Sequence, residues 1–294
     1  MLDASTVPPL AETENWVRMS HVNRRAALGG GAAALGYALA AQPVLANRVE
    51  TPSAGLDAGM ISFPASEGFR MNAYRAKPLG KTKAPVVLVV QEIFGLHEWI
   101  QDITRRFAQA GYYAIAPDMY QRQGDPTREA DIQTLFRTIV SQVPDAQVMA
   151  DLDAAAAFAG TDGGNADRLG VTGFCWGGRI TWLYASHNPD VKAGVAWYGR
   201  VLGEPSELQP THPIDVVGRL NAPVLGLYGD LDKGIPVADV EKMNAALKAA
   251  NDPGFIRLFE GADHGFLADY RPSYNPAAAK EAWVDALKWF GKYL

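Results

Sequence analysis

The sequence predicts an α/β fold in which helices cover both faces of a mostly parallel central sheet. Uninterrupted apolar runs, such as residues 85–90, are typical of strands that are buried on both faces. These runs alternate with stretches of helical spacing, which indicates parallel strands joined by helical crossovers. The composition, with 48% hydrophobic and 20% charged residues, suits one domain, predicted over residues 47–294.

Each predicted element has a local signal. Strands are short runs of apolar, β-branched or aromatic residues, and helices are longer segments with apolar residues at i, i+3, i+4 and i+7. The first helix ends at Gly111. The predicted strands cover residues 61–63, 74–76, 85–90, 112–116, 168–174, 193–198, 223–228 and 255–259. The predicted helices lie near residues 100–110, 127–142, 145–159, 237–250 and 277–292, and another begins at Ile180. Residues 200–221 contain several prolines and are expected to form an irregular loop.

Residues 1–46 have the features of a twin-arginine export signal. Arg24 and Arg25 precede an uncharged run of Gly, Ala and Leu that ends in small residues at Ala46. We therefore expect cleavage after Ala46 and a periplasmic location. The alternative is a membrane anchor, but the glycines and alanines make the run only weakly apolar, and Pro43 interrupts its end.

Composition argues against several classes of partner. The net charge of -5 and the lack of a basic, aromatic-rich stretch argue against nucleic acid. One cysteine excludes an internal disulfide and a cysteine-rich zinc site. No ligand cluster or dinucleotide fingerprint occurs, so neither a metal nor an organic cofactor is predicted. The sequence gives no indication of oligomeric state.

Residues 173–177 have the Gly-x-Cys-x-Gly spacing of a nucleophile elbow, with Cys175 in the place of Ser. A strand that turns directly into a helix strains its central residue, and side chains two positions away would collide with neighbouring backbone. The turn places the Cys175 sulfur at a helix N-terminus, where the dipole and free N–H groups favour a thiolate. The alternative is a buried apolar cysteine, as most lone cysteines are.

A base and an acid follow later strands, at the sheet edge where chemistry gathers in this architecture. His264 is the predicted base, because histidines in the leader, at a helix end and in the irregular loop have ordinary surface settings. Asp230 or Asp232 could orient it, and the Asp-x-x-Ile-Pro context favours Asp232. The order Cys175, Asp232, His264 is that of α/β hydrolases, which makes the predicted architecture an α/β-hydrolase fold.

The loop after the strand at residues 85–90 is expected to supply one oxyanion N–H, and the residue after the nucleophile another. This assigns the backbone amides of Ile93 and Trp176 as donors. The negative charge of Glu92 would disfavour an oxyanion beside such donors, so the residue is expected to have a function of its own. The alternative is that Glu92 is a solvated loop acid.

Aromatic residues near the elbow are candidates for the walls of a substrate pocket. Tyr198 lies at a strand end, and Phe94 and Phe266 flank the predicted site. The alternative for each is core packing, which is the usual role of aromatic residues beside an elbow.

Five motifs in order resemble the dienelactone hydrolase family (carboxymethylenebutenolidases). They are Gln-Glu-Ile-Phe-Gly at 91–95, Pro-Asp-Met-Tyr-Gln-Arg at 117–122, Gly-Phe-Cys-Trp-Gly-Gly at 173–178, Asp-Lys-Gly-Ile-Pro at 232–236 and His-Gly-Phe at 264–266. The resemblance spans roughly residues 60–292. It implies a Cys175–His264–Asp232 triad that opens a lactone or carboxylic ester through a thioester. It also implies that Glu92 pairs with the resting thiol and moves when substrate binds.

The resemblance is incomplete where the family holds a substrate carboxylate with two arginines and a serine. Arg122 matches one arginine, but Gly265 stands in place of the serine and Ala268 in place of the second arginine, with Arg271 displaced nearby. The reaction type is therefore indicated more firmly than the substrate. The alternatives are a promiscuous esterase or thioesterase, or a non-catalytic binding or thiol-sensing protein on the same fold.

Overall fold

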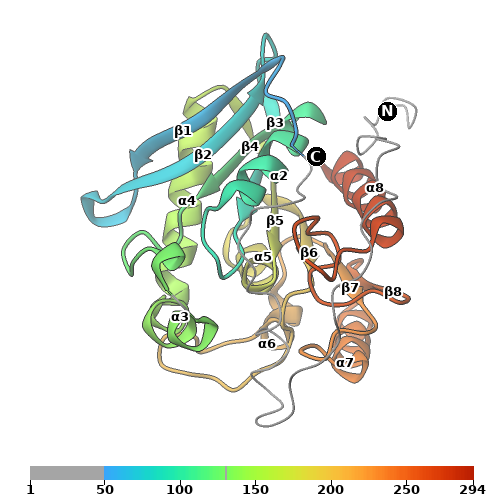
Figure 1. Cartoon of the computed structure of the whole chain (residues 1–294). Coiled ribbons are helices and arrows are strands. Elements are labelled where there is room, and N and C mark those ends of the chain that lie inside the picture. Colours follow the sequence, from blue (N-terminus) through green and yellow to red (C-terminus); the bar gives the residue numbers. More distant parts are fainter. Residues whose placement is uncertain (1–49, 130) are drawn as a thin grey trace, which may run out of the picture.

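The computed structural model describes residues 50–129 and 131–294, which form one α/β unit (Figure 1). The predicted export signal at residues 1–46 lies outside the described residues. None of the described helices combines the length and the apolar character that crossing a membrane requires.

The described residues form an eight-stranded sheet with the order β1-β2-β4-β3-β5-β6-β7-β8. β2 runs antiparallel to both β1 and β4, and every neighbouring pair from β4 to β8 is parallel. The strands are β1 (Leu56–Pro64), β2 (Arg70–Pro78), β3 (Ala84–Val90), β4 (Tyr113–Pro117), β5 (Gly164–Phe174), β6 (Val191–Trp197), β7 (Val224–Gly229) and β8 (Phe255–Phe259). The mostly parallel sheet confirms the predicted fold class.

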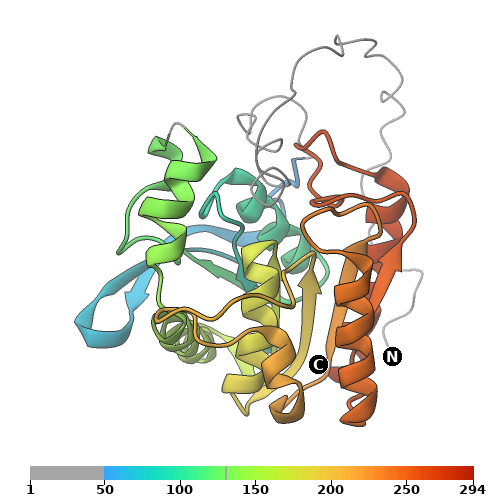
Figure 2. The same cartoon turned by 90° about the horizontal axis from the view of Figure 1, so that it is seen from below.

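Helices cover both faces of this sheet, with α2 and α8 on one side and α4 and α5 on the other (Figure 2). The helices are α2 (Glu98–Gln109), α3 (Ile132–Thr138), α4 (Asp145–Thr161), α5 (Trp176–His187), α6 (Pro213–Val216), α7 (Val237–Ala249) and α8 (Pro276–Tyr293). Short 3-10 turns occupy Ser66–Gly68, Pro126–Arg128, Val140–Gln142 and Val217–Arg219. α2 meets α8 through the ring of Phe107, whose centroid lies 4.7 Å from that of Trp283.

The core explains why the central strands are continuously apolar. Every residue of β3 is buried, because helices pack on both of its faces. The helix predicted near 127–142 is in fact the shorter α3, preceded and followed by 3-10 turns. The loop predicted at 200–221 is mainly irregular, but it contains α6, where Asp215 accepts a hydrogen bond from the His212 N–H and Pro213 starts the first turn.

A single residue turns β5 into α5. β5 ends at Phe174 and α5 begins at Trp176, so Cys175 makes the turn alone, with φ 57° and ψ -111°. A Cβ on Gly173 would lie 2.1 Å from the carbonyl oxygen of Gly177. A Cβ on Gly177 would lie 2.5 Å from the carbonyl oxygens of Val90 and Gln91, where β3 ends. Only glycine allows the elbow to pack this closely against the end of β3.

We expect Gly177→Ala to lower the free energy of unfolding by at least about 2 kcal/mol, because its methyl group would meet backbone that cannot move aside. Denaturant unfolding would measure the loss. Gly59→Ala is the matched control, since a Cβ there meets nothing within 4 Å. Equal midpoints for Gly177→Ala and wild type would contradict the steric account of the elbow.

Candidate active site

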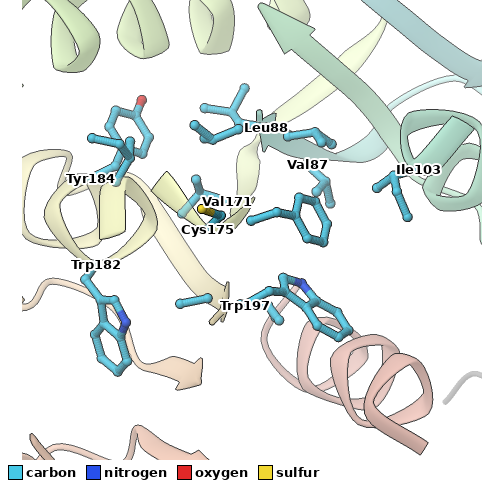
Figure 3. Close-up of a cluster of buried hydrophobic side chains, with 14 of the residues drawn as sticks. Val87, Leu88, Ile103, Val171, Cys175, Trp182, Tyr184 and Trp197 are labelled. Atoms are coloured by element: carbon cyan, nitrogen blue, oxygen red, sulfur yellow. The ribbon is translucent and has the colours of Figure 1, made fainter. Parts of the chain in front are cut away.

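Cys175 lies at the floor of a cavity of about 640 Å³. Its side chain is only 2% exposed, and its sulfur lies beside Val171 where β5 meets α5 (Figure 3). The cysteine is therefore buried, yet it contributes to the surface of a cavity large enough for a small-molecule ligand.

Asp232 and His264 form a buried pair next to this cysteine. Asp232 Oδ2 lies 2.7 Å from His264 Nδ1. Asp230 instead accepts a hydrogen bond from the Gly261 N–H at 2.8 Å, and Asp263 accepts one from the backbone N–H of His264. Of these three carboxylates, the structure brings Asp232 to the imidazole ring, as the sequence context favours.

His264 links Asp232 to the cysteine. Burial lowers the pKa of His264, but the Cys175 sulfur, which hydrogen-bonds with the ring, and the Asp232 carboxylate outweigh this effect and raise the pKa to about 10. The Tyr198 ring packs edge-on against His264, with centroids 5.1 Å apart, and helps to fix its orientation. The arrangement favours a charged imidazolium beside the sulfur at neutral pH.

Two backbone amides of the cavity wall are available to a bound oxygen atom. Ile93 and Trp176 line the same cavity as Cys175. Trp176 is the first residue of α5, so its N–H has no acceptor within the helix. Within residues 50–129 and 131–294, neither its N–H nor that of Ile93 donates to another protein group. Both amides can therefore donate to a ligand in the cavity.

Glu92 is fully buried, and side chains other than the thiol hold its carboxylate. Arg271 Nη2 donates to Oε1 at 2.8 Å, and the Tyr270 hydroxyl donates to Oε2 at 2.5 Å. Burial raises the pKa of Glu92, but Arg271, His97 and Tyr270 together lower it to about 2. The structure corrects the expectation that Glu92 pairs with the resting Cys175 thiol, because a buried carboxylate requires a cation and Arg271 supplies it.

Arg271 reaches Glu92 because the loop after His264 leaves room for it. Gly265 has φ 76°, and a Cβ there would lie 2.8 Å from Arg271 Cδ. Asp269 anchors the loop by accepting a hydrogen bond from Arg106 Nη2 of α2 at 2.6 Å. The glycine in place of serine and the displaced arginine thus have one explanation: the arginine side chain occupies the space beside the glycine.

The predicted aromatic walls do not line the cavity. Phe266 is fully buried and packs against Phe259, with centroids 5.3 Å apart. Phe94 stacks under the Arg271 guanidinium at 5.3 Å, and Tyr198 is fully buried against His264. The substrate-binding roles predicted for Tyr198, Phe94 and Phe266 are therefore corrected, because Tyr198 and Phe266 fill the core and the partly buried Phe94 supports the Arg271 guanidinium.

Arg122 is not available to a substrate either. It forms a two-pronged ion pair with the buried carboxylate of Asp151, with Nη2 2.9 Å from Oδ1, and its guanidinium stacks on the Phe69 ring at 4.0 Å. It is absent from the cavity wall. The prediction that Arg122 binds a substrate carboxylate is thus corrected, because Asp151 occupies the guanidinium fork.

The cavity wall instead comes from two segments for which the sequence predicted no role in the site. The α3 side contributes Ile132, Phe136 and Arg137, and the chain after β6 contributes Arg200 and His212. His212, expected on the surface, is 5% exposed. A signal was available for Arg200, which comes shortly after Tyr198 at the same strand end, where functional groups of this fold gather.

No group of three or more His, Cys, Asp or Glu side chains among the described residues is arranged to hold a metal ion.

Comparisons with known proteins identify the family that this chain matches. Residues 71–294 match the model of the dienelactone hydrolase family. A Salmonella typhimurium protein named "Putative carboxymethylenebutenolidase" is 54% identical over 88% of this chain and 96% of its own. A protein of the same name from Methylorubrum extorquens is 53% identical over 88% and 90%. The crystal structure of a "Putative Dienelactone Hydrolase" from Klebsiella pneumoniae superposes with a TM-score of 0.80 at 56% identity, covering 81% of this chain and 99% of that chain.

The Glu92–Arg271 pair predicts a specific loss of stability in acid. The folded-state pKa of Glu92, about 2, lies below the ordinary value of 4.5, so the pair stabilises the fold above pH 4.5 and that contribution is lost as pH falls towards 2. We expect the loss to be on the order of 3 kcal/mol. The measurement is the free energy of unfolding of wild type and of Glu92→Gln/Arg271→Gln between these pH values. Parallel pH dependences for the two proteins would contradict the prediction.

Proposed function

This chain belongs to the dienelactone hydrolase family, and we propose that it opens a lactone or carboxylic ester through a Cys175–His264–Asp232 triad and a thioester intermediate. Its relatives of carboxymethylenebutenolidase type indicate a lactone or ester hydrolase. The observation that carries the mechanism is the position of His264, with Asp232 on one side of its ring and the sulfur of the cavity floor on the other.

In the first half of the reaction, the Cys175 thiolate attacks the carbonyl carbon of the substrate. The negative charge that develops on the carbonyl oxygen is stabilised by the N–H groups of Ile93 and Trp176. The tetrahedral intermediate collapses, the bond to the leaving oxygen breaks, and His264 donates its proton to that oxygen. Asp232 holds the ring in the orientation that both transfers require.

In the second half, neutral His264 removes a proton from a water molecule, and the resulting hydroxide attacks the thioester carbon. The same two amides stabilise the second oxyanion. Collapse of this intermediate expels the Cys175 thiolate and releases the carboxylic acid, which restores the imidazolium–thiolate pair. For a lactone, the acid and the former leaving group remain parts of one molecule.

Glu92 has a supporting role in this mechanism. Glu92 directly precedes Ile93 in the chain, and its carboxylate pairs with Arg271. The two buried charges therefore compensate each other beside the proposed oxyanion donors. Arg271 thereby removes the electrostatic penalty that an unpaired carboxylate would impose on a developing oxyanion.

We expect Cys175→Ala to lower kcat/KM by at least about a thousandfold, because the nucleophile is lost. Asp232→Asn should lower it by about a hundredfold or more, since the amide no longer stabilises the imidazolium. The assay is hydrolysis of an enol lactone and a 4-nitrophenyl ester. Mass spectrometry of wild type with a slow ester should find the acyl group on Cys175, removable by hydroxylamine.

Asp230→Asn is the matched control for Asp232→Asn, because it lies two residues away, does not touch the ring and can still accept its hydrogen bond from Gly261. It should keep nearly wild-type activity. Full activity of Cys175→Ala would refute the mechanism, and equal losses in the two aspartate variants would refute the assignment of the acid.

We also propose that the protein is exported and cleaved after Ala46, on the strength of Arg24, Arg25 and the weakly apolar run that follows. Arg24→Lys/Arg25→Lys should keep the protein in the cytoplasm, because the twin-arginine pathway reads that pair. Fractionation and N-terminal sequencing of wild type and variant test this. Periplasmic wild-type protein beginning near residue 47 is expected, and unprocessed protein in the membrane fraction would favour the anchor.

A further inference from the structure

We propose that Arg179 is a positioning residue that fixes the shape of the cavity above Cys175. It fastens residues 200–212, the segment that leads from β6 to α6 and forms part of the cavity wall, onto the helix that follows the nucleophile. The proposal deepens the proposed function, on which it rests, because it names the residue that decides which acyl groups the cavity holds well.

Arg179 lies one turn after the nucleophile, and its side chain reaches the cavity wall. Its backbone N–H donates to the Cys175 carbonyl oxygen at 3.3 Å in the first turn of α5. The residue is only 4% exposed, yet it lines the cavity. Gly199 packs directly on this turn, since a Cβ there would lie 2.3 Å from the Arg179 nitrogen. The 200–212 segment therefore starts from a point that is fixed against α5.

Asp145, the first residue of α4, holds the guanidinium of Arg179 in a two-pronged ion pair. Nη1 and Nη2 each donate to one of its carboxylate oxygens at 2.7 Å. The backbone N–H of Asp145 donates to the Leu208 carbonyl oxygen at 2.9 Å. The start of α4 thus orients the guanidinium and contacts the 200–212 segment at the same residue.

Arg179 also binds the far end of the segment. Its Nη2 donates to the Thr211 carbonyl oxygen at 2.6 Å, and its Nε lies 3.5 Å from His212 Nδ1. Because a guanidinium can only donate, Nδ1 accepts, and Nε2 carries the proton that it donates to the Glu204 carbonyl oxygen at 3.1 Å. The imidazole packs so closely on Gly203 that a Cβ there would lie 2.5 Å from its Cε1. Arg179 and His212 thereby tie the segment together from Gly203 to Thr211.

These contacts give Arg179 a role in the shape of the cavity. Four of its five N–H groups donate to protein acceptors, and Asp145 balances its charge. A buried ion pair adds little net stability, because the cost of desolvation offsets the attraction, and apolar side chains of similar volume often stabilise as well. The pair instead gives the 200–212 segment a single position relative to the sulfur.

The test is the dependence of hydrolysis on acyl length, measured with neutral 4-nitrophenyl esters from acetate to octanoate. We expect wild type to prefer a longer ester over acetate, because the cavity wall buries apolar chains. In Arg179→Met/Asp145→Leu, which leaves neither charge unpaired, kcat/KM for that ester should fall by roughly tenfold to a hundredfold, as a displacement of about 1 Å can cause. The acetate ester should change by less than about threefold, because its acyl group makes the fewest contacts with the wall.

Arg122→Met/Asp151→Leu is the matched control, because it removes another two-pronged pair that does not line the cavity. It should keep the wild-type preference for acyl length. Arg179→Lys keeps the charge but loses the planar fork, so its preference should fall in the same direction, and it serves as the test if the apolar variant does not fold. Hydrogen exchange, followed by mass spectrometry, should be faster in residues 200–212 of the Arg179 variants than in wild type.

The proposal is overturned if wild type prefers no longer ester, or if the Arg179 variants keep the wild-type preference. Equal losses for acetate and the longer esters would also overturn it, because they would place the defect at the sulfur, and so would the same loss of preference in the control. These outcomes leave the proposed function intact as long as Cys175→Ala abolishes hydrolysis of the acetate ester. Full activity of Cys175→Ala on that ester would instead refute the proposed function.

Discussion

The close packing of the Cys175 turn against the end of β3 is the constraint on which the rest of the site depends. A non-glycine residue at φ 57° is strained, at a cost of order 1–3 kcal/mol, and it persists only where the surrounding structure enforces it. Here the glycines on either side allow α5 to start directly over the backbone of Val90 and Gln91. The same contact sets the distance between Cys175 and the loop that carries Ile93, so the sulfur and the amides of Ile93 and Trp176 form one rigid unit.

Electrostatic compensation is the second organising feature, and it works through pairs. Glu92 is neutralised by Arg271, Asp151 by Arg122, and Asp145 by Arg179, all at buried or nearly buried positions. An unpaired charge at any of these sites would carry a desolvation penalty of several kcal/mol. These arginines are paired with carboxylates inside the fold. The unpaired positive charge of the cavity therefore comes from arginines that are exposed to solvent.

The cavity owes its shape to the least regular parts of the chain. α3 and the chain after β6 both contribute to its wall, while Cys175 lies at the turn from β5 to α5. This division places Cys175 next to the rigid sheet and much of the remaining cavity wall on α3 and on the chain after β6. Changes in these segments can therefore alter the shape of the cavity without disturbing the turn that holds Cys175.

The sequence by itself predicted the architecture and the three residues of the proposed triad, because both leave local signals. Buried parallel strands require continuous apolar runs, the elbow requires glycines at fixed spacing, and Asp232 and His264 follow strands whose ends meet at one edge. Only the tertiary structure decided which arginine lines the cavity. Arg122, Arg271 and Arg200 look alike in sequence, and their roles depend on whether a carboxylate distant in the chain lies within reach. Asp151 and Glu92 lie within reach of the first two, and the packing of Gly199 and Val201 leaves Arg200 in the cavity wall.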